Sequence, residues 1–319
     1  MKHTKIIDFH CDVLYKMLYE NKVNFENAEL MDITLPRLKK GQVGMQVFAL
    51  FLEAAPLIGP PRFAQVLRAI DLFREQIAVL PEMHWVKWKE DLEMLEQDRS
   101  LIGSILSLEG VDALEGDMVY VRTLFELGVR FIGLSWNHAN WAVDGAGEPR
   151  SGGFTTEGWQ LVDECDRLGI VLDVSHLNER AFWELMDGTT RPVIASHSNC
   201  ASLQPHPRNL TDDQIRAIIA RDGRIGVTYV PLFVAEKELV TIEDLLGHID
   251  HIIQLGGENH LMLGSDFDGI DDKIQNLEHA EHHPNLLAMI EQRYGSAVMN
   301  KIAYENANRF LRTYLPQRV

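Results

Sequence analysis

The chain has 319 residues, of which 46% are hydrophobic and 24% are charged, and its formal net charge at pH 7 is −17. This length and composition fit a soluble protein that buries a sizeable core, as one large α/β domain or as two smaller ones. The negative charge argues against nucleic acids and anionic membranes as partners, because both require a basic surface.

The N-terminal segment, MKHTKIIDFH, does not resemble a targeting sequence. It lacks the longer apolar region and the small-residue cleavage site of a signal peptide. No apolar run in the sequence reaches the ~18–20 residues that span a bilayer. The three cysteines, Cys11, Cys165 and Cys200, form neither a CxxC pair nor a disulfide framework, which suits a reducing compartment. We therefore expect a cytoplasmic protein without a membrane partner.

Eight short apolar segments recur along the chain. Most are almost continuously hydrophobic and rich in β-branched residues, which is the pattern of strands buried on both faces of a parallel sheet. They lie at residues 5–9, 45–51, 103–108, 129–134, 169–174, 192–196, 224–230 and 260–265.

Amphipathic segments with helical spacing separate these strands, and four of them are clear, at residues 62–80, 155–169, 210–223 and 241–257. Several begin at Thr caps and end at Gly. Eight strands that alternate with helices predict a (β/α)₈ TIM-type barrel, with an open doubly wound sheet as the alternative. No Gly-rich or Pro-rich linker divides the chain, so we expect residues 1–319 to form a single domain with a C-terminal helical segment.

The segment HAEHHPN, residues 279–285, is a short cluster of histidines. No apolar strand positions it, and we expect a solvated loop there rather than a metal site.

The first predicted strand carries ionisable side chains. Asp8, His10 and Asp12 occupy alternate positions in IIDFHCDVL, and alternation is the side-chain period of a strand. We therefore expect all three to project from the same face, where burial of unpaired charges would be expensive. Cations would compensate His10 and Asp12. Asp8 would either orient His10 or satisfy backbone groups.

Potential metal ligands also follow four of the later strands. Glu109 follows the third strand, His176 the fifth, His197 the sixth and Asp266 the eighth. In a (β/α)₈ barrel the C-terminal ends of the strands form one rim, where active sites are found. These side chains should therefore converge and form a metal site.

The types of ligand narrow the choice of metal. Imidazoles and carboxylates suit Zn²⁺, with Mn²⁺, Co²⁺ or Fe²⁺ as possible substitutes. The candidates exceed the three protein ligands of a mononuclear zinc site, which predicts two ions roughly 3.5–4 Å apart that share a carboxylate. Glu109 would bridge them, with His10 and Asp12 on one ion and His176 and His197 on the other.

Several motifs keep their order over nearly the whole chain: IIDFHCD, LSLEG, LDVSH, IASHSN, RNLTDDQIRAI, LGSDFDG and ENANRFLR. In these motifs the sequence resembles the membrane dipeptidase (renal dipeptidase) family of zinc peptidases, and it looks like a soluble bacterial-type member. The resemblance implies a (β/α)₈ barrel of metal-dependent hydrolase architecture, with a binuclear zinc site. It also implies hydrolysis of dipeptides, often with a D-residue at the C-terminal position, and suggests a homodimer.

The resemblance implies the same five metal ligands as the residue pattern. It adds Asp266 as the proton-transfer group and Arg208 as the group that binds the substrate carboxylate, for which an Arg fork is well suited. Some members of the family place a substrate-binding His after the fourth strand, in a threonine–histidine pair, and this chain departs from that pattern. This chain reads GLSWNHANW there, so Trp136, Asn137 and His138 are the candidates for that role.

We therefore predict a dipeptidase in which a metal-bridging hydroxide attacks the peptide carbonyl and Asp266 passes a proton to the departing amine. One alternative is another binuclear amidohydrolase that acts on a cyclic amide, a lactone or an N-acyl amino acid. Many such enzymes bridge their metals with a carboxylated lysine, but none of the eight predicted strands ends in such a lysine. The other alternative, a non-catalytic metal- or peptide-binding barrel, is disfavoured because the ligands and Asp266 are all present.

Overall fold

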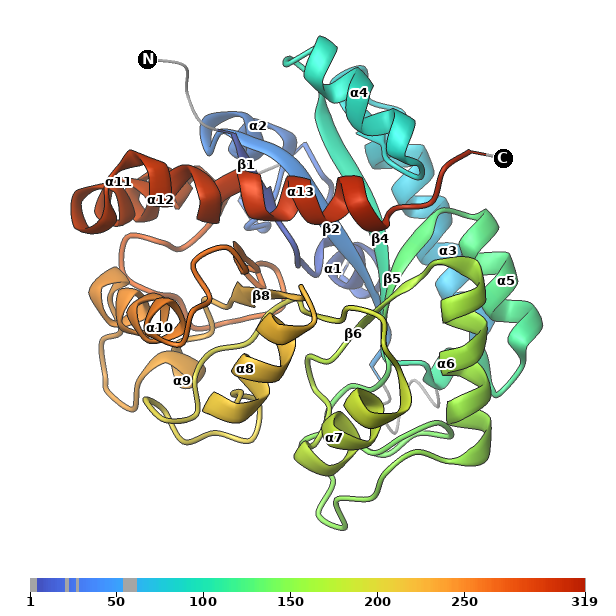
Figure 1. Ribbon diagram of the computed structural model, residues 1–319. Helices are drawn as coiled ribbons and strands as arrows, with labels where there is room; N and C mark the ends of the chain where they lie inside the picture. Colours follow the sequence, from blue (N-terminus) through green and yellow to red (C-terminus); the bar gives the residue numbers. More distant parts are fainter. Residues whose placement is uncertain (1–4, 21–22, 27–28, 54–61, 319) are drawn as a thin grey trace.

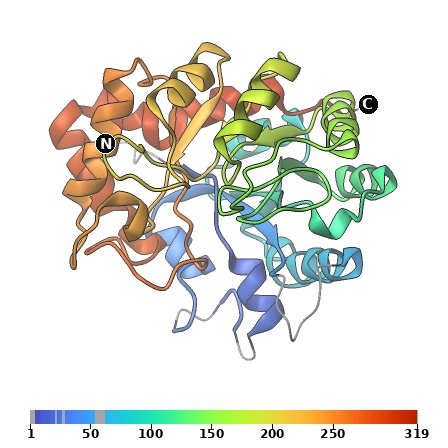
Figure 2. The same cartoon turned by 90° about the horizontal axis from the view of Figure 1, so that it is seen from below.

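The computed structural model describes residues 5–20, 23–26, 29–53 and 62–318, and helices surround a central parallel barrel (Figures 1 and 2). Eight strands form the closed ring, in the order β1-β2-β4-β5-β6-β7-β8-β9, and the β9–β1 and β2–β4 pairings complete it. The strands are β1 (Ile6–Asp8), β2 (Val43–Phe51), β4 (Ile102–Glu109), β5 (Val129–Gly133), β6 (Val171–Asp173), β7 (Ile194–Ala195), β8 (Arg224–Val227) and β9 (Leu261–Leu263). The predicted (β/α)₈ barrel is thereby confirmed, and the open sheet is excluded.

A ninth strand, β3 (Met83–Trp85), was not predicted. It pairs with Ile102–Ser104 at the start of β4, whereas β5 pairs with Leu106–Glu109 at the end of β4. The sequence signal is weak because β3 has only three residues and two of them are partly exposed.

The four clear helix predictions are confirmed. They correspond to α3 (Phe63–Phe73), which continues as a π-helical turn (Arg74–Ala78), and to α6 (Thr156–Leu168), α8 (Asp212–Ala220) and α10 (Ile242–Gln254). The ends of α6 show the physical cause. The Thr155 hydroxyl accepts a hydrogen bond from the Gly158 backbone N–H, and Gly169 stops the helix with a φ of 78°, which glycine adopts without steric cost.

The remaining α-helices are α1 (Val13–Tyr19), α2 (Leu35–Lys40), α4 (Lys89–Gln97), α5 (Met118–Glu126), α7 (Glu179–Gly188), α9 (Pro231–Val234), α11 (His283–Tyr294), α12 (Ser296–Asn300) and α13 (Asn306–Tyr314). The last of these, α13, crosses the strands in Figure 1. Its Phe310 and Leu311 pack in one cluster with Ile7, Met45 and Phe131 of the barrel. The helix therefore covers the end of the barrel where the strands begin and leaves the opposite end free.

Two sequence predictions are wrong in detail. Asp8, His10 and Asp12 do not lie on one strand, because β1 ends at Asp8; His10 and Asp12 still converge, with 3.4 Å between Nε2 and Oδ2, whereas the Asp8 carboxylate bonds to Ser265. Residues 279–285 are not a solvated loop. They form a 3₁₀ turn (Ala280–His282) and the start of α11, and His283 is fully buried. Among the described residues, no helix is both long and apolar enough to cross a membrane.

Candidate metal centre

The C-terminal ends of five strands bring the predicted metal ligands together. Glu109 is the last residue of β4, His176 and His197 follow β6 and β7, and Asp266 follows β9. His10 follows β1. Asp12, at the N-terminal end of α1, turns back toward it. The convergence follows from the ring of parallel strands, since all their C-terminal ends meet at one rim.

Glu109 is at the centre of the cluster. Its Oε1 lies 2.8 Å from His176 Nε2 and 3.5 Å from His197 Nε2. Its Oε2 lies 3.4 Å from His10 Nε2, which is also 3.4 Å from Asp12 Oδ2. The two oxygens of one carboxylate are thus divided between two sets of donors.

The burial of the donor atoms and their hydrogen bonds show whether metal ions fit them. The side chains of Asp12, Glu109 and Asp266 are only 6%, 9% and 14% exposed. His10 Nε2 and Asp12 Oδ1 have no hydrogen-bond partner in the described part of the chain. Three buried carboxylates around unpaired donor atoms are unfavourable without a compensating cation. The nitrogen and carboxylate oxygen donors fit metal ions. Two groups of three lie close enough to hold an ion, His10, Glu109 and His197 or His10, Asp12 and Asp266, and both include His10.

Two of the imidazoles are oriented by a second hydrogen bond. His176 Nδ1 lies 2.9 Å from Asn137 Oδ1, and His197 Nδ1 lies 2.7 Å from Ser196 Oγ. Such contacts fix the ring so that Nε2 faces the other donors. Asn137 follows β5, so the segment after a neighbouring strand supports the ligand after β6. Ser196 was not predicted, although it directly precedes His197 in IASHSN.

Burial and neighbouring charges act differently on the ionisable groups. Burial raises the pKa of Asp266 to about 7, and the Asp12 and Glu109 carboxylates add to this effect. Burial lowers the pKa of His176 to about 4. Burial also opposes the charged form of His10, but Glu109 and Asp12 outweigh it and raise the pKa of His10 well above 6.5.

The backbone at the site is unusual. His176 and Asp266 have φ values of 71° and 68°, in the left-handed region that non-glycine residues seldom adopt. Such strain persists only where the surroundings impose it, and it is frequent at functional sites. Gly269 lies in the same turn as Asp266, and a Cβ at this glycine would lie 2.2 Å from Asp12 Oδ2. Its lack of a side chain therefore leaves room for the Asp12 carboxylate.

Asp8 does not contact the His10 imidazole. Its carboxylate accepts hydrogen bonds from the backbone N–H and the hydroxyl of Ser265, at 2.8 and 2.6 Å, and from the backbone N–H of His10, at 3.4 Å. Of the two roles that the sequence left open for Asp8, satisfying backbone groups is therefore the one observed.

The cluster opens into a cleft of about 290 Å³. Its lining combines candidate metal ligands, aromatic rings, two further charged groups and several smaller or apolar residues: Asp12, Tyr15, Phe51, Glu53, Glu109, Trp136, Asn137, His176, Arg208, Val230, Phe233, Asp266, Gly269 and Ile270. Tyr15, Phe51, Glu53 and Phe233 were not predicted. Only their positions at the end of a strand, just after one, or in the helix that follows one could have indicated them.

Arg208 is buried, yet it has no carboxylate partner within 4 Å among the described residues. Its Nη2 donates to the His197 carbonyl at 3.3 Å, and its guanidinium lies 5.6 Å from the centre of the Phe233 ring. Nε has no hydrogen-bond partner within the described residues. Burial lowers the pKa of Arg208 to about 10, so it remains charged at neutral pH. The cleft therefore contains a cationic group that can accept an anion.

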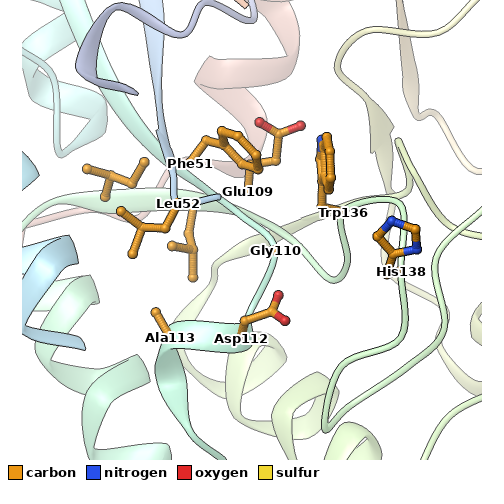
Figure 3. A pocket seen from close by; sticks show the side chains of 10 residues that line it. Phe51, Leu52, Glu109, Gly110, Asp112, Ala113, Trp136 and His138 are labelled. Atoms are coloured by element: carbon orange, nitrogen blue, oxygen red, sulfur yellow. The ribbon is translucent and has the colours of Figure 1, made fainter. Parts of the chain in front are cut away.

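The three candidates after the fourth predicted strand occupy different positions. Trp136 lines the cleft beside Phe51, with 5.2 Å between the ring centres, and Asn137 contacts His176. His138 lines a smaller adjacent pocket with Leu52 and Ala113. Figure 3 shows the Glu109 carboxylate and the Trp136 ring facing the same space, with His138 on the other side of Trp136.

The sequence model of the membrane dipeptidase family (peptidase family M19) matches residues 1–315. An uncharacterized dipeptidase of Schizosaccharomyces pombe is 30% identical over 317 residues, covering 92% of this chain and 76% of the relative.

Two solved structures are similar over almost their whole length. Dipeptidase AC, a metallopeptidase of family M19, has a TM-score of 0.90 and 27% identity, with 98% of this chain and 99% of that chain covered. A metallopeptidase from Rhodobacter sphaeroides, solved with a phosphinate mimic of the dipeptide L-Ala-D-Ala, has a TM-score of 0.86 and 26% identity, with the same coverage.

Proposed function

The chain belongs to the membrane dipeptidase family (peptidase family M19), and from this premise we propose that it is a zinc-dependent dipeptidase that accepts a D-residue at the C-terminal position. One observation carries the proposal. The Glu109 carboxylate divides its oxygens between two sets of buried donors, in a cleft that also contains the buried guanidinium of Arg208.

We propose that the site holds two Zn²⁺ ions, with Mn²⁺, Co²⁺ or Fe²⁺ as substitutes. His10 and Asp12 would hold one ion, His176 and His197 the other, and Glu109 both. Bound metal ions supply two kinds of chemistry here: they lower the pKa of water and polarise the peptide carbonyl. Asn137 and Ser196 would keep the histidine rings oriented toward the ions.

Arg208 would bind the C-terminal carboxylate of the substrate. A guanidinium presents a fork of donors that matches a carboxylate, and Arg208 Nε has no partner in the described residues. Because Arg208 lines the same cleft as Glu109, this contact would restrict substrates to short peptides.

Asp266 would carry the proton from the attacking water to the departing amine. It lies in the cleft, with Oδ1 3.7 Å from His10 Nε2. A carboxyl group at this position can accept a proton from water and donate it to an amine.

The preference for a D-residue has a narrower basis. It is supported by the family resemblance and by the Rhodobacter sphaeroides metallopeptidase, whose bound ligand mimics L-Ala-D-Ala. We further propose a cytoplasmic location and a homodimer, which cell fractionation and sedimentation of the native protein would test.

The decisive experiment is hydrolysis of L-Ala-D-Ala and L-Ala-L-Ala by the zinc-loaded protein, with Asp266→Asn as the comparison. We expect cleavage that includes the D-terminal dipeptide. The variant should lose roughly 10²-fold or more in turnover, a typical general acid–base contribution, while its zinc content is unchanged. Equal turnover in the variant would refute the role of Asp266.

If neither dipeptide is cleaved by protein that holds two metal ions, the dipeptidase proposal fails. N-acyl amino acids would then be the next substrates to test, because Arg208 could bind their carboxylate in the same way.

A further inference from the structure

We propose that Glu53 gives the cleft a preference for dipeptides whose N-terminal residue has a cationic side chain, such as lysine or arginine. The inference rests on the proposed dipeptidase function and concerns the choice among dipeptides.

Glu53 follows the C-terminal end of β2, at the rim of the barrel where the candidate metal ligands also lie. The last residue of β2, Phe51, pairs in register with Glu109 of β4, so the two are at the same height in the barrel. Glu53 is two residues further along, which can advance the chain by up to about 7 Å. Its side chain lines the same cleft.

Glu53 and Arg208 come from opposite sides of the barrel. β2 and β7 face one another across the ring, with three strands between them in either direction. Arg208 is anchored after β7 by its bond to the His197 carbonyl, whereas Glu53 follows β2. A dipeptide whose carboxylate binds Arg208 and whose peptide bond lies at Glu109 would therefore extend its N-terminal residue toward Glu53.

The surroundings of Glu53 suit an organic cation. The Tyr15 hydroxyl donates a hydrogen bond to Glu53 Oε2 at 2.7 Å and so holds the carboxylate in place. The Phe51 ring lies 5.3 Å from that of Tyr15 and 5.2 Å from that of Trp136. A carboxylate beside several aromatic faces attracts an ammonium or guanidinium group, and the rings can also cover its apolar stem.

The other carboxylates of the cleft are occupied by the proposed chemistry. Asp12, Glu109 and Asp266 each have an oxygen within 3.7 Å of His10 Nε2. The α-ammonium group of a dipeptide is adjacent to the peptide carbonyl and would stay near these three. Only a long side chain would reach Glu53, which is why the inference concerns the side chain of the N-terminal residue.

The test compares L-lysyl-, L-norleucyl- and L-alanyl-alanine, with the alanine enantiomer that the protein cleaves. Norleucine has the same apolar stem as lysine but no charge. We expect kcat/KM for the lysyl substrate to exceed that for the norleucyl substrate by about tenfold or more, mainly through KM, as a charge-assisted hydrogen bond would give. Glu53→Gln should abolish this advantage, so that the ratio of kcat/KM for the lysyl and norleucyl substrates falls to about one.

Two further variants separate the contact from general effects. Tyr15→Phe keeps the ring but removes the hydroxyl that holds Glu53, and it should reduce the lysine advantage in part. Glu20→Gln removes an exposed carboxylate just after α1, outside the cleft lining, and should change nothing.

The possible failures are distinguishable. If the wild-type protein cleaves the lysyl and norleucyl substrates equally well, the inference is overturned and the dipeptidase function stands. If Glu53→Gln lowers cleavage of all three substrates by the same factor, Glu53 does not select side chains and the inference is again overturned. If no dipeptide is cleaved by metal-loaded protein, the proposed function itself fails.

Discussion

His176 shows how a single side chain depends on two segments of the chain. Its Nε2 contacts Glu109 at 2.8 Å, and its Nδ1 contacts Asn137 at 2.9 Å. His176 also has a φ of 71°, so its backbone has little freedom to adjust. The position of this imidazole therefore depends on contacts with two other segments of the chain.

Replacement of Asn137 should weaken metal binding. Asn137→Leu removes the oxygen that faces His176 Nδ1, and loss of such a supporting contact typically lowers metal affinity by about 10- to 100-fold. Asn137→Asp retains an oxygen at the same position and should retain most of the affinity. Titration of each metal-free protein with zinc against a competing chelator gives the two affinities. Equal affinities in wild type and Asn137→Leu would show that Asn137 has no supporting role.

The proposed contact between Arg208 and the substrate carboxylate leads to a prediction about substrates. Arg208→Met removes the guanidinium and should raise KM for a dipeptide by about 10- to 100-fold, which corresponds to the loss of a charge-assisted hydrogen bond. A dipeptide amide has no carboxylate, so its hydrolysis should be slow with both proteins and should differ little between them. Steady-state kinetics with the two substrates measures this difference. A similar loss for the amide would mean that Arg208 serves the fold and not the carboxylate.

At this scale the sequence predicted the residues that follow apolar strands and missed the contacts between loops. Glu109, His176 and His197 were identifiable because each follows an apolar segment of a regular βα alternation. The contact between Asn137 and His176 was not, because it joins two loops whose paths no local pattern specifies. Glu53 was missed for the same reason.

At the scale of elements, α11 begins at a buried histidine. His283 Nδ1 lies 3.3 Å from the Tyr229 hydroxyl, its ring centre lies 5.5 Å from that of Phe267, and its Nε2 lies 3.8 Å from Asp8 Oδ2. Burial lowers the pKa of His283 from 6.5 to about 4. The helix is thus attached to the barrel through an imidazole that is neutral in the folded protein.

This environment makes stability depend on pH. In the unfolded chain His283 binds a proton below a pH of about 6.5, whereas in the folded protein it does so only below about 4. Between these values the unfolded state binds more protons, so the free energy of unfolding decreases as the pH falls. The contribution lost between about pH 7.5 and about pH 5 is about 2 kcal/mol. His283→Asn should therefore show a smaller decrease in unfolding free energy over this range than the wild-type protein.

Urea unfolding of both proteins at the two pH values, with chelator present, measures the difference. His176 and His197 also have lowered pKa values, but they contribute equally to both proteins and cancel. Parallel pH dependence in wild type and variant would show that His283 has no such role, whatever the absolute stability of the variant.

The elements differ in how far the sequence determined them. The helices α6 and α8 were predictable because Thr155 and Thr211 cap them with local hydrogen bonds. β3 was not, since it depends on a place left free along the edge of β4. The same holds for the turn at residues 280–282 and the start of α11, where burial by the barrel decides the structure of a polar sequence.

At the scale of the whole molecule, the two ends of the barrel have different roles. α13 closes one end with Phe310 and Leu311, and the other carries the donor cluster. This arrangement gathers acidic groups in a protein whose net charge is already −17. Mutual repulsion of buried carboxylates destabilises the folded state, and bound cations would remove that repulsion.

Metal loading should therefore stabilise the entire fold. An ion that binds only the folded protein raises the free energy of unfolding by about 2.7 kcal/mol when its free concentration is a hundred times Kd. The melting temperature of the metal-free protein should rise steadily as zinc is added. Glu109→Gln should lose most of this rise, because Glu109 contacts both sets of donors and its replacement removes charge without changing shape.

The matched control is Glu93→Gln, which removes an exposed carboxylate on α4 and should leave the zinc response as in the wild type. An equal zinc-dependent rise in the Glu109 variant would assign the stabilising ion to a different site. Because the five donors come from the ends of β1, β4, β6 and β7, ions bound among them would link distant parts of the barrel. A zinc-dependent rise in melting temperature that is lost in Glu109→Gln and kept in Glu93→Gln would therefore assign the stabilisation to the metal centre.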